Sequence, residues 1–217
     1  MPRWSLLIPA AGSGSRMGGK KKPLLRLDGK PLIVHALAAF RGIADIVIAV
    51  PPGEATRWKK LLGIDATFVD GGARRQDSVE RALVAAEDPT HVLVHDAARP
   101  FPGRETVKRV MEATVKVGAA IPGLPVADTL KRVDALGLVT ETVPRGGLWR
   151  VQTPQGVRAD WLREAFVKAA REGWEVTDEA MLLEKSGRPV AVVEGDPRNL
   201  KVTTAADWKL LKGRSQR

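Results

Sequence analysis

A glycine-rich loop with cations behind it is the segment of this sequence best suited to chemistry. The apolar run Leu6–Ile8 gives way to small residues at Pro9–Gly14, and Arg16 and the lysines 20–22 follow. Glycines reach positive φ and let the backbone approach a ligand closely. Consecutive backbone N–H groups in such a loop form an anion site, to which nearby cations add charge. We therefore expect a polyphosphate there, which indicates a nucleotide-handling enzyme.

The spacing of the glycines matches neither of two common phosphate-binding motifs. Gly12 and Gly14 could begin a dinucleotide fingerprint, but the next glycine, Gly18, comes one position too late. Gly14 and Gly19 have the spacing of a P-loop, which then needs Ser or Thr where this chain has Lys21. An ordinary surface loop is the alternative for this segment.

Two further polar segments follow strand-like runs. The segment Asp70–Ser78 contains two glycines, and its alternative to ligand contact is a capped helix with Asp77 or Ser78 as N-cap. In the segment His95–Pro100, Asp96 follows an apolar strand directly and is well placed to hold Mg²⁺ beside phosphates.

The segment His95–Pro100 and two segments later in the chain have structural interpretations as well. Asp96 could instead cap a helix or pair with Arg99, and His95 is expected to be buried rather than catalytic. Thr177–Ala180 reads as a capping signal ahead of a helix over 181–185. Lys201 interrupts a short apolar strand, where it either contacts phosphate or is a surface lysine.

The composition narrows the class of protein. No cysteine is present among the 217 residues, which excludes disulfides, a cysteine nucleophile and thiolate metal sites. The 35 Lys and Arg exceed the 25 Asp and Glu, so the formal charge is +10 and a polyanionic partner is expected. No nucleic-acid-binding signature accompanies that charge, so phosphorylated metabolites fit better than nucleic acid. Without a signal peptide or a long apolar run, we expect a cytoplasmic protein with no membrane partner.

Strand-like and helix-like segments alternate along the chain. Short apolar runs at Ser5–Pro9, Ile46–Val50, Thr67–Val69 and Val92–His95 are typical of buried parallel strands. Between and after them, residues 79–86, 107–114 and 162–169 have the apolar spacing of amphipathic helices. This alternation predicts an α/β fold with a mainly parallel sheet flanked by helices, and ligands then bind at the carboxyl ends of its strands.

One segment breaks this alternation. Residues 126–133 and 138–143 read as extended, with a turn at Asp134–Gly137, so they predict a hairpin. Its polar content is too high for a core position, and an isolated hairpin is marginal in water. We therefore expect the hairpin to lean on a second subunit.

Taken in order along the chain, these motifs resemble the 2-C-methyl-D-erythritol 4-phosphate cytidylyltransferases of the non-mevalonate isoprenoid pathway. The resemblance extends from Leu6 to about Asp207. The segments that carry it are Pro9–Met17, Gly71–Val79, His95–Pro100, Asp128–Thr129, Arg145, Trp149, Thr153–Gln155, Thr177–Ala180 and Asn199–Thr203.

The resemblance implies a Rossmann-like, twisted, mainly parallel sheet of the nucleotidyltransferase type, in a single domain over residues 1–217. A protruding β-hairpin arm, residues 124–147, would join a homodimer. Arg16 and Lys22 would be the catalytic cations on the phosphates of CTP, and Asp96 would hold the cofactor Mg²⁺. The other residues expected to bind CTP or methylerythritol phosphate are Ala10, Ala11, Gly12, Gly14, Met17, Gly71, Ala73, Arg75, Ser78, Ala97, Arg99, Thr129, Arg145, Thr153 and Lys201.

Two positions depart from the family pattern. The family usually has Pro-Lys-Gln where this chain has Lys21-Lys22-Pro23, so Lys20 and Lys21 stay alternatives to Lys22. Ala73 replaces a more usual polar residue, which we expect to be tolerated because the backbone is the contact.

The implied reaction is nucleotidyl transfer, in which a phosphate oxygen attacks the α-phosphorus of CTP. Because that oxygen is already anionic, no general base is needed, and catalysis consists of positioning and charge stabilisation. A ribitol 5-phosphate cytidylyltransferase is the nearest alternative. A basic nucleic-acid-binding protein and a nucleotide-binding regulatory protein without turnover are the alternatives from other classes.

Overall fold

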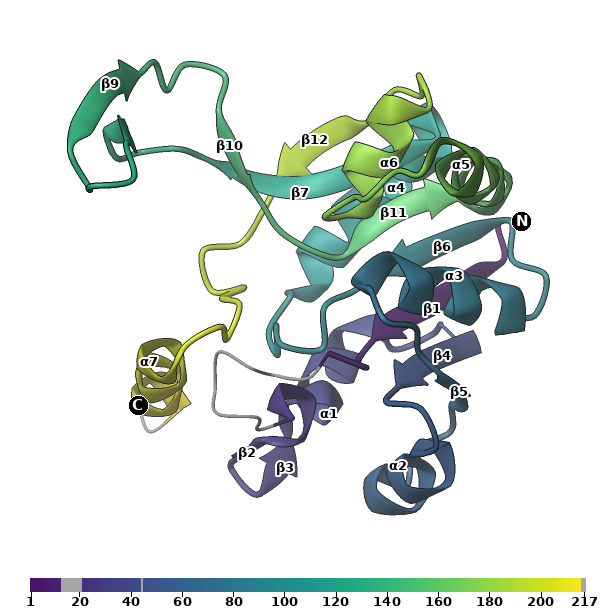
Figure 1. Cartoon of the computed structure of the whole chain (residues 1–217). Helices are drawn as coiled ribbons and strands as arrows, with labels where there is room; N and C mark the ends of the chain where they lie inside the picture. Colours follow the sequence, from purple (N-terminus) through teal and green to yellow (C-terminus); the bar gives the residue numbers. More distant parts are fainter. Residues whose placement is uncertain (13–20, 44, 216–217) are drawn as a thin grey trace.

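The computed structural model describes residues 1–12, 21–43 and 45–215. Its main sheet has eight strands in the order β10-β7-β11-β6-β1-β4-β5, with β12 beside β7 (Figure 1). The pairs β1–β4, β1–β6, β4–β5 and β7–β12 are parallel, while β11 and β10 run antiparallel to their neighbours. The predicted α/β class with a mainly parallel sheet is confirmed.

The strands of this sheet lie close to where the apolar runs predict them. They are β1 (Trp4–Pro9), β4 (Asp45–Val50), β5 (Thr67–Asp70), β6 (His91–Val94), β7 (Ala119–Pro125), β10 (Trp149–Val151), β11 (Gln155–Arg158) and β12 (Ala191–Glu194). Two short hairpins add β2 (Arg26–Leu27) with β3 (Lys30–Pro31), and β8 (Leu130–Val133) with β9 (Val139–Val143).

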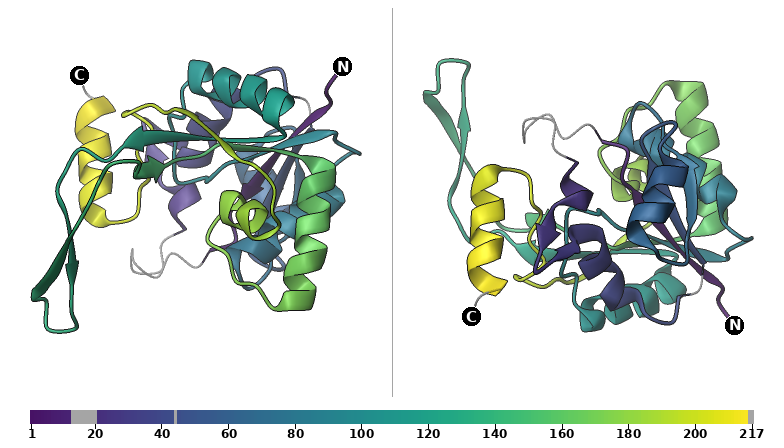
Figure 2. Two further views of the ribbon diagram at one scale, coloured as in Figure 1. Left: turned by 90° about the horizontal axis from the view of Figure 1, so that it is seen from above. Right: turned by 90° about the horizontal axis from the view of Figure 1, so that it is seen from below.

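Helices cover both faces of the sheet, as Figure 2 shows from above and below. They are α1 (Leu32–Leu37), α2 (Ala55–Leu62), α3 (Arg75–Ala85), α4 (Arg104–Val117), α5 (Ala159–Glu172), α6 (Glu179–Lys185) and α7 (Ala205–Ser215), with 3₁₀ turns η2 (Lys22–Leu24) and η3 (Ala38–Phe40). No helix in the described part of the chain has the length and apolar character needed to cross a membrane.

Alternating side chains on the strands separate two hydrophobic cores. In β1, Leu7 packs with residues of α3 and α5 such as Val79 and Leu162 on one face. Leu6 and Ile8 pack on the other face with residues that include Val107 of α4. Because the central strands are buried on both faces, they read as continuous apolar runs in the sequence.

The order of the strands creates the edge at which a ligand can bind. β1 lies in the middle, with β4 on one side and β6 on the other, and all three run parallel. The chain therefore leaves the sheet after β5 and returns on the opposite side of β1, which makes a topological switch point between β1 and β6. The loops that follow Pro9, Val50, Asp70 and Val94 all lie at this edge.

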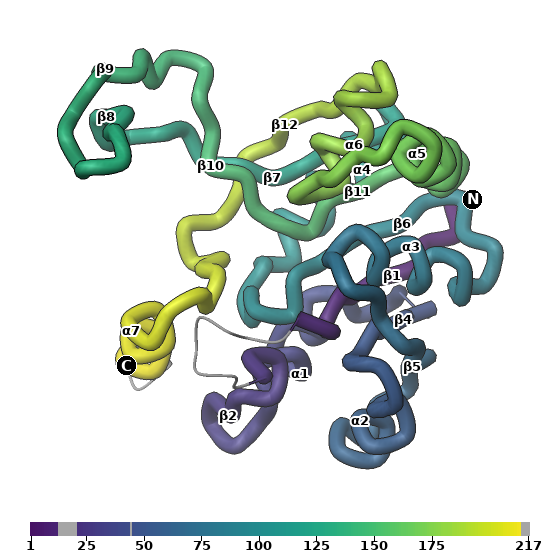
Figure 3. Tube along the Cα trace, in the orientation of Figure 1, coloured from purple at the N-terminus to yellow at the C-terminus, as the bar shows by residue number. Residues whose placement is uncertain are grey.

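The hairpin of β8 and β9 projects away from the body of the molecule (Figure 3). The predicted turn at Asp134–Gly137 is confirmed, but the first strand begins at Leu130 rather than at Val126. Residues 126–129 connect β7 to β8 and contain a bend at Asp128, so the sequence did not mark the start of the strand.

Three further expectations about local structure differ from the structure. Lys201 does not lie in a strand; residues 199–203 form a loop, and Val202 is buried beside Leu27, Leu32 and Leu211. Neither Asp77 nor Ser78 is the N-cap of α3, which begins at Arg75. β6 also ends at Val94, one residue before the predicted limit.

Candidate active site

A cleft of about 610 Å³ opens at the predicted edge of the sheet. The loops after four parallel strands supply its walls, so segments far apart in the sequence meet there. The residues that line it are Pro9, Ala11, Gly12, Pro52, Gly71, Gly72, Ala73, Arg74, Arg75, Ser78, Arg81 and Asp96. The structure thus brings together six of the predicted binding residues and the predicted metal ligand.

Small residues on one wall bring two loops into contact. A Cβ at Gly71 would lie 2.4 Å from the Cβ of Ala11 and 2.8 Å from the Oγ of Ser78. Ala10 N–H donates to the carbonyl of Ala49 and Gly71 N–H to that of Val50, each at 2.7 Å, so both loops continue from their strands. A larger residue at position 71 would separate these walls.

The hydroxyl of Ser78 shapes the turn before α3. It accepts a hydrogen bond from Gly72 N–H at 3.1 Å and lies 3.2 Å from the carbonyl of Arg74, to which it donates. Arg74 occupies the N-cap position, where its N–H donates to Asp77 at 3.0 Å. Asp77 and Ser78 therefore both stabilise the start of α3 from inside the helix.

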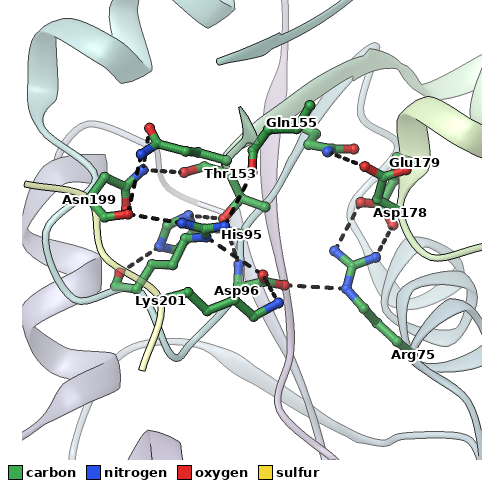
Figure 4. A network of polar contacts seen from close by, with 12 residues as sticks. Arg75, His95, Asp96, Thr153, Gln155, Asp178, Glu179, Asn199 and Lys201 are labelled. Atoms are coloured by element: carbon green, nitrogen blue, oxygen red, sulfur yellow. Dashed lines mark hydrogen bonds and ion pairs between the residues drawn. The ribbon is translucent and has the colours of Figure 1, made fainter. Parts of the chain in front are cut away.

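Asp96 lies at the centre of a cluster of three cations (Figure 4). Its Oδ2 is 2.7 Å from Nζ of Lys201 and 3.8 Å from Nε of Arg99. Its Oδ1 is 3.3 Å from Nε of Arg75. The predicted pairing with Arg99 is present, and two further cations that are distant in sequence join it.

The surroundings of Asp96 keep its carboxylate charged. Burial by itself raises the pKa of Asp96, but the charges of Arg75, Lys201 and Arg99 outweigh it and hold the pKa well below its usual range. The carboxylate is therefore ionised at neutral pH, and its lowered pKa makes it a weak acceptor of protons.

Arg75 connects Asp96 to a second buried carboxylate. Its two terminal nitrogens bind the two oxygens of Glu179 at 2.8 and 3.0 Å, and the side chain of Glu179 is 3% exposed. Burial lowers the pKa of Arg75, but the charges of Glu179 and Asp96 raise it above its ordinary value overall. Glu179 was expected only as part of a helix-capping signal, and sequence analysis missed this role.

His95 and Thr153 lie beneath Asp96 and hold its backbone. His95 Nε2 is 2.9 Å from the carbonyl of Arg99, so Nε2 carries the proton, and Nδ1 accepts from the Thr153 hydroxyl at 2.9 Å. The Thr153 oxygen in turn accepts from Asp96 N–H at 3.1 Å. Burial lowers the pKa of His95 to about 4, so the ring is neutral, in agreement with the prediction that His95 is buried.

Lys201 reaches Asp96 because the chain on both sides of it is anchored. The carbonyl of Asn199 accepts from Arg99 at 2.9 Å, and the side-chain amide of Asn199 donates to the carbonyl of Thr153 at 2.8 Å. Val202 N–H donates to the carbonyl of Ala98 at 2.9 Å. Both anchoring residues are fully buried, while Lys201 itself is exposed and contacts Asp96.

The remaining predicted residues fall into three groups. Ala97 is buried beneath the cleft next to Asp96. Thr129 and Arg145 lie on the arm and not in the cleft; both are exposed, and Arg145 donates to the carbonyl of Ala127 within the arm. Gly14, Arg16, Met17 and Lys20 lie outside the described residues.

The structure bears on which lysine of the row 20–22 serves the cleft. Lys21 forms an ion pair with Glu54, and the other oxygen of Glu54 accepts from the Trp58 indole at 3.0 Å. The contacts with Lys21 and Trp58 lower the pKa of Glu54. Lys21 is thus engaged in anchoring the chain after the glycine loop to the start of α2. The choice of Lys22 over Lys20 and Lys21 as the catalytic lysine stays a prediction from the sequence.

Asp96 fits a magnesium ion that is held mainly by its ligand's phosphates. Within the described ranges, no group of three or more His, Asp or Glu side chains is placed to hold a metal ion. Mg²⁺ is commonly bound through one or two carboxylates together with substrate phosphates and water. A single buried carboxylate that lines the cleft matches that donor set.

A second cavity, of about 470 Å³, lies between η3, the loop 100–104 and α7. Its walls include Phe101, Ala38 and Leu211. None of the predicted site residues lines it, so the chemistry of the side chains favours the first cleft as the active site.

Comparison with known proteins gives one consistent result. The family model of 2-C-methyl-D-erythritol 4-phosphate cytidylyltransferase matches residues 5–212. The enzyme of that name from Thermus thermophilus is 47% identical over 208 residues, which cover 95% of this chain and 94% of the relative. Its counterpart from Bacillus cereus is 44% identical over 213 residues, 94% of each chain.

Solved structures agree over nearly the whole chain. A crystal structure of 2-C-methyl-D-erythritol 4-phosphate cytidylyltransferase from Thermus thermophilus matches with a TM-score of 0.86 and 43% identity, over 98% of both chains. The 4-diphosphocytidyl-2C-methyl-D-erythritol synthase from Anaerococcus prevotii matches with a TM-score of 0.84 and 27% identity, over 99% of this chain and 98% of the other.

Proposed function

The chain belongs to the 2-C-methyl-D-erythritol 4-phosphate cytidylyltransferase family, and on that basis we propose that it transfers the cytidylyl group of CTP to 2-C-methyl-D-erythritol 4-phosphate. The products are 4-diphosphocytidyl-2-C-methyl-D-erythritol and pyrophosphate, and the reaction belongs to non-mevalonate isoprenoid biosynthesis. The observation that carries the proposal is the cleft in which a small-residue loop meets Asp96 and its three cations.

The chemistry requires no general base. A phosphate oxygen of the methylerythritol phosphate forms a bond to the α-phosphorus of CTP, and the bond from that phosphorus to the bridging oxygen breaks, so pyrophosphate leaves. The attacking oxygen is already anionic, so no group has to accept a proton from it. In agreement, both nitrogens of His95 are engaged in hydrogen bonds and Asp96 is paired with cations. Arg16 and Lys22 would neutralise the charge that develops on the α-phosphate and on the leaving group.

The cytidine would lie against the small residues of the cleft. Ala11, Gly12 and Gly71 let a base and ribose approach the backbone, and Ala73 leaves its backbone accessible. Asp96 would hold Mg²⁺, which supplies charge neutralisation to the triphosphate when it is bound. Arg75, beside Asp96, adds positive charge at the inner end of the cleft.

The phosphate of the second substrate would bind at the opposite end of the cluster. Arg99 Nε is buried and makes no hydrogen bond among the described residues, although Asp96 Oδ2 lies 3.8 Å away. Lys201 is exposed at the same place. An unsatisfied guanidinium donor beside an accessible ammonium group is suited to an incoming phosphate, because a charge-assisted hydrogen bond would satisfy it.

A second subunit would complete the site. Val133, Leu136, Leu138 and Val139 are exposed on the hairpin, and an isolated two-stranded hairpin is marginally stable in water. We propose that the arm, residues 124–147, packs on a second copy of the chain, so that Thr129 and Arg145 contact the methylerythritol phosphate in the partner's cleft. The same proposal places the protein in the cytoplasm, with metabolites rather than nucleic acid or membranes as its partners.

Pyrophosphate release by the purified protein tests the reaction. The assay contains CTP, Mg²⁺ and methylerythritol phosphate, beside controls with ATP, GTP or UTP and with ribitol 5-phosphate. We expect release only with CTP and methylerythritol phosphate. Release with ribitol 5-phosphate alone would reject the proposed acceptor, and no release with any pair would reject the activity.

The catalytic lysine is tested by comparing two neighbouring variants. We expect K22A to lower kcat about 100-fold, the typical loss for one transition-state donor, with little change in stability. K21A removes the ion pair with Glu54 and is expected to affect kcat less. Near-normal turnover of K22A would reject the role of Lys22, and a larger loss in K21A would transfer it to Lys21.

A further inference from the structure

We propose that Glu179 is a positioning residue, which holds Arg75 in one orientation so that Asp96 keeps a carboxylate oxygen available to the cation that accompanies the triphosphate. This inference rests on the proposed function. Figure 4 shows the three side chains in a row, with Arg75 between the two carboxylates.

The geometry of the pair fixes Arg75. Glu179 accepts from both terminal nitrogens of Arg75, at 2.8 and 3.0 Å, and this leaves Nε to face Asp96 Oδ1 at 3.3 Å. A bidentate pair of this kind defines both the position and the plane of a guanidinium group. Because Arg75 thus makes one longer contact with Asp96, the carboxylate of Asp96 is not enclosed by it.

The position of Glu179 is itself fixed by the start of α6. Asp178 caps the helix by accepting from Met181 N–H at 3.0 Å. Gln155 of β11 donates to Asp178 at 2.9 Å and accepts from Ala180 N–H at 3.0 Å. The first turn of α6 is therefore attached to the sheet on both sides of Glu179, which is 2% exposed.

The charges explain what Glu179 prevents. Asp96 and Glu179 together face Arg75, Arg99 and Lys201, so the cluster carries one excess positive charge. Without the charge of Glu179, the two terminal nitrogens of Arg75 keep at most one neutral oxygen acceptor at this position, and Asp96 is the neighbouring carboxylate. We expect Arg75 to turn toward Asp96, where it competes with the cation that accompanies CTP.

The variant E179Q tests this role, because it keeps the shape and removes the charge. We expect kcat to fall 10- to 100-fold, as is usual when a residue that orients a ligand group is changed. The KM for CTP is expected to change less than about threefold, and the Mg²⁺ concentration for half-maximal rate to rise about tenfold.

The matched control is D178A, which removes the cap of the same helix without touching Arg75. We expect D178A to lower the midpoint of urea unfolding but to change kcat and the Mg²⁺ dependence much less than E179Q does, because Gln155 still accepts from Ala180 N–H and holds the first turn of α6. A loss of kcat in D178A as large as in E179Q would mean that both act by loosening α6, and it would overturn the proposal.

A double-variant comparison shows whether Glu179 acts through Arg75. If it does, E179Q changes kcat little once Arg75 has been replaced in R75Q, since the residue being positioned is gone. Additive losses in E179Q/R75Q would overturn the proposal. The NMR signal of the Arg75 Nε–H group, identified by its absence in R75K, gives a readout independent of activity: it is expected to shift in E179Q and to stay in place in D178A.

The outcome is separable from that of the proposed function. If the unchanged protein releases no pyrophosphate, the proposed function fails, whereas unchanged kcat and Mg²⁺ dependence in E179Q with an active parent reject only the role of Glu179. Should E179Q fail to fold, E179D carries the same test, because it keeps the charge and shortens the reach. A lowered kcat with retained CTP affinity in E179D supports the proposal, and an unchanged kcat overturns it.

Discussion

The cleft and the hairpin arm place the same kinds of charged side chain in opposite surroundings. In the cleft, Arg75 and Glu179 have side chains that are 26% and 3% exposed, and they belong to a cluster that joins several strands and loops. On the arm, Arg132 and Glu141 are 66% and 50% exposed and bind each other across one hairpin. A buried ion pair depends on the whole fold, whereas an exposed one depends on little beyond its own strands.

The difference indicates which parts of the site one chain can assemble alone. Every charged group around Asp96 is held by contacts from the same chain. Thr129 and Arg145 are exposed, and Arg145 donates a hydrogen bond to the carbonyl of Ala127 within the arm. The cleft is therefore expected to respond to substitution in both stability and turnover, and the arm in turnover alone.

The largest effect is expected for D96N. This change leaves three cations around a neutral amide, so the free energy of unfolding is expected to fall by about 2 kcal/mol, a value below that of a fully buried pair because Lys201 is exposed. We expect kcat to fall by two to three orders of magnitude. Urea unfolding and pyrophosphate release measure the two effects. Turnover within about threefold of the unchanged protein would show that Asp96 has no role in the reaction.

A comparable loss of turnover without a loss of stability is expected for R145A. We expect kcat/KM for methylerythritol phosphate to fall about 100-fold, because Arg145 would supply a charged donor to the phosphate. Since the side chain is exposed, unfolding at matched protein concentration should change by less than about 0.5 kcal/mol. A fall in stability with unchanged kcat/KM would show that Arg145 stabilises the fold and does not bind the phosphate, contrary to the role expected for the arm.

Part of the pH dependence of stability is expected to come from His95 beneath Asp96, whereas the arm contains no histidine. Burial lowers the pKa of His95 to about 4, below its ordinary value near 6.5, so the unfolded chain binds a proton that the folded chain excludes. Stability is therefore full above pH 6.5 and is lost as the pH falls toward 4.

Between pH 7 and pH 5, this group is expected to cost about 2 kcal/mol, and the variant H95Q should lose that part of the dependence. The stabilisation that comes from the lowered pKa of Asp96 is fully present above its unfolded pKa near 3.8 and is lost only below that value. Asp96 therefore does not change the stability between pH 7 and pH 5. Urea unfolding of both proteins at the two pH values checks the prediction. Equal pH dependence in the two proteins would show that His95 is not the group responsible.

The smallest effect is expected for R132A on the arm. Its ion pair with Glu141 is exposed, so we expect unfolding to change by less than about 0.5 kcal/mol and turnover to stay near that of the parent. R132A is also the control for R145A, because it removes an arginine from the same arm. A loss of turnover equal to that of R145A would indicate that the general charge of the arm matters rather than one donor.

The location of the cleft could be predicted because it follows from the direction of the strands. Parallel strands end at one edge, so the loops after Leu6–Ile8 and Val92–Val94 had to meet, and with them Gly12 and Asp96. The pairing of Asp96 with Arg99, three residues apart, was also within reach of sequence reasoning.

Contacts between distant segments could not be predicted in this way. Arg75 and Glu179 are 104 residues apart, and no local pattern connects a helix start after β5 with the start of α6. Lys201 was wrongly assigned to a strand because Leu200 and Val202 flank it. Val202 is buried against Leu27 and Leu211 and so belongs to a packed loop, whose burial depends on α7.

The start of α3 shows a different limit. Asp77 and Ser78 are both residues that favour N-caps, but the helix begins earlier, and both side chains bond back to the turn that leads into it. Polar residues thus showed that a helix starts in this segment, but they did not fix its first residue.

Mixing two inactive variants tests most directly the central claim that cleft and arm from different subunits form one site. D96N provides an intact arm and R145A an intact cleft, so a mixed dimer contains one complete site. After unfolding and refolding together in equal amounts, we expect about a quarter of the turnover of the unchanged protein, because half of the randomly formed dimers are mixed and each has one working site. Turnover that stays at the level of the separate variants, in refolded dimers, would show that the arm serves the cleft of its own chain.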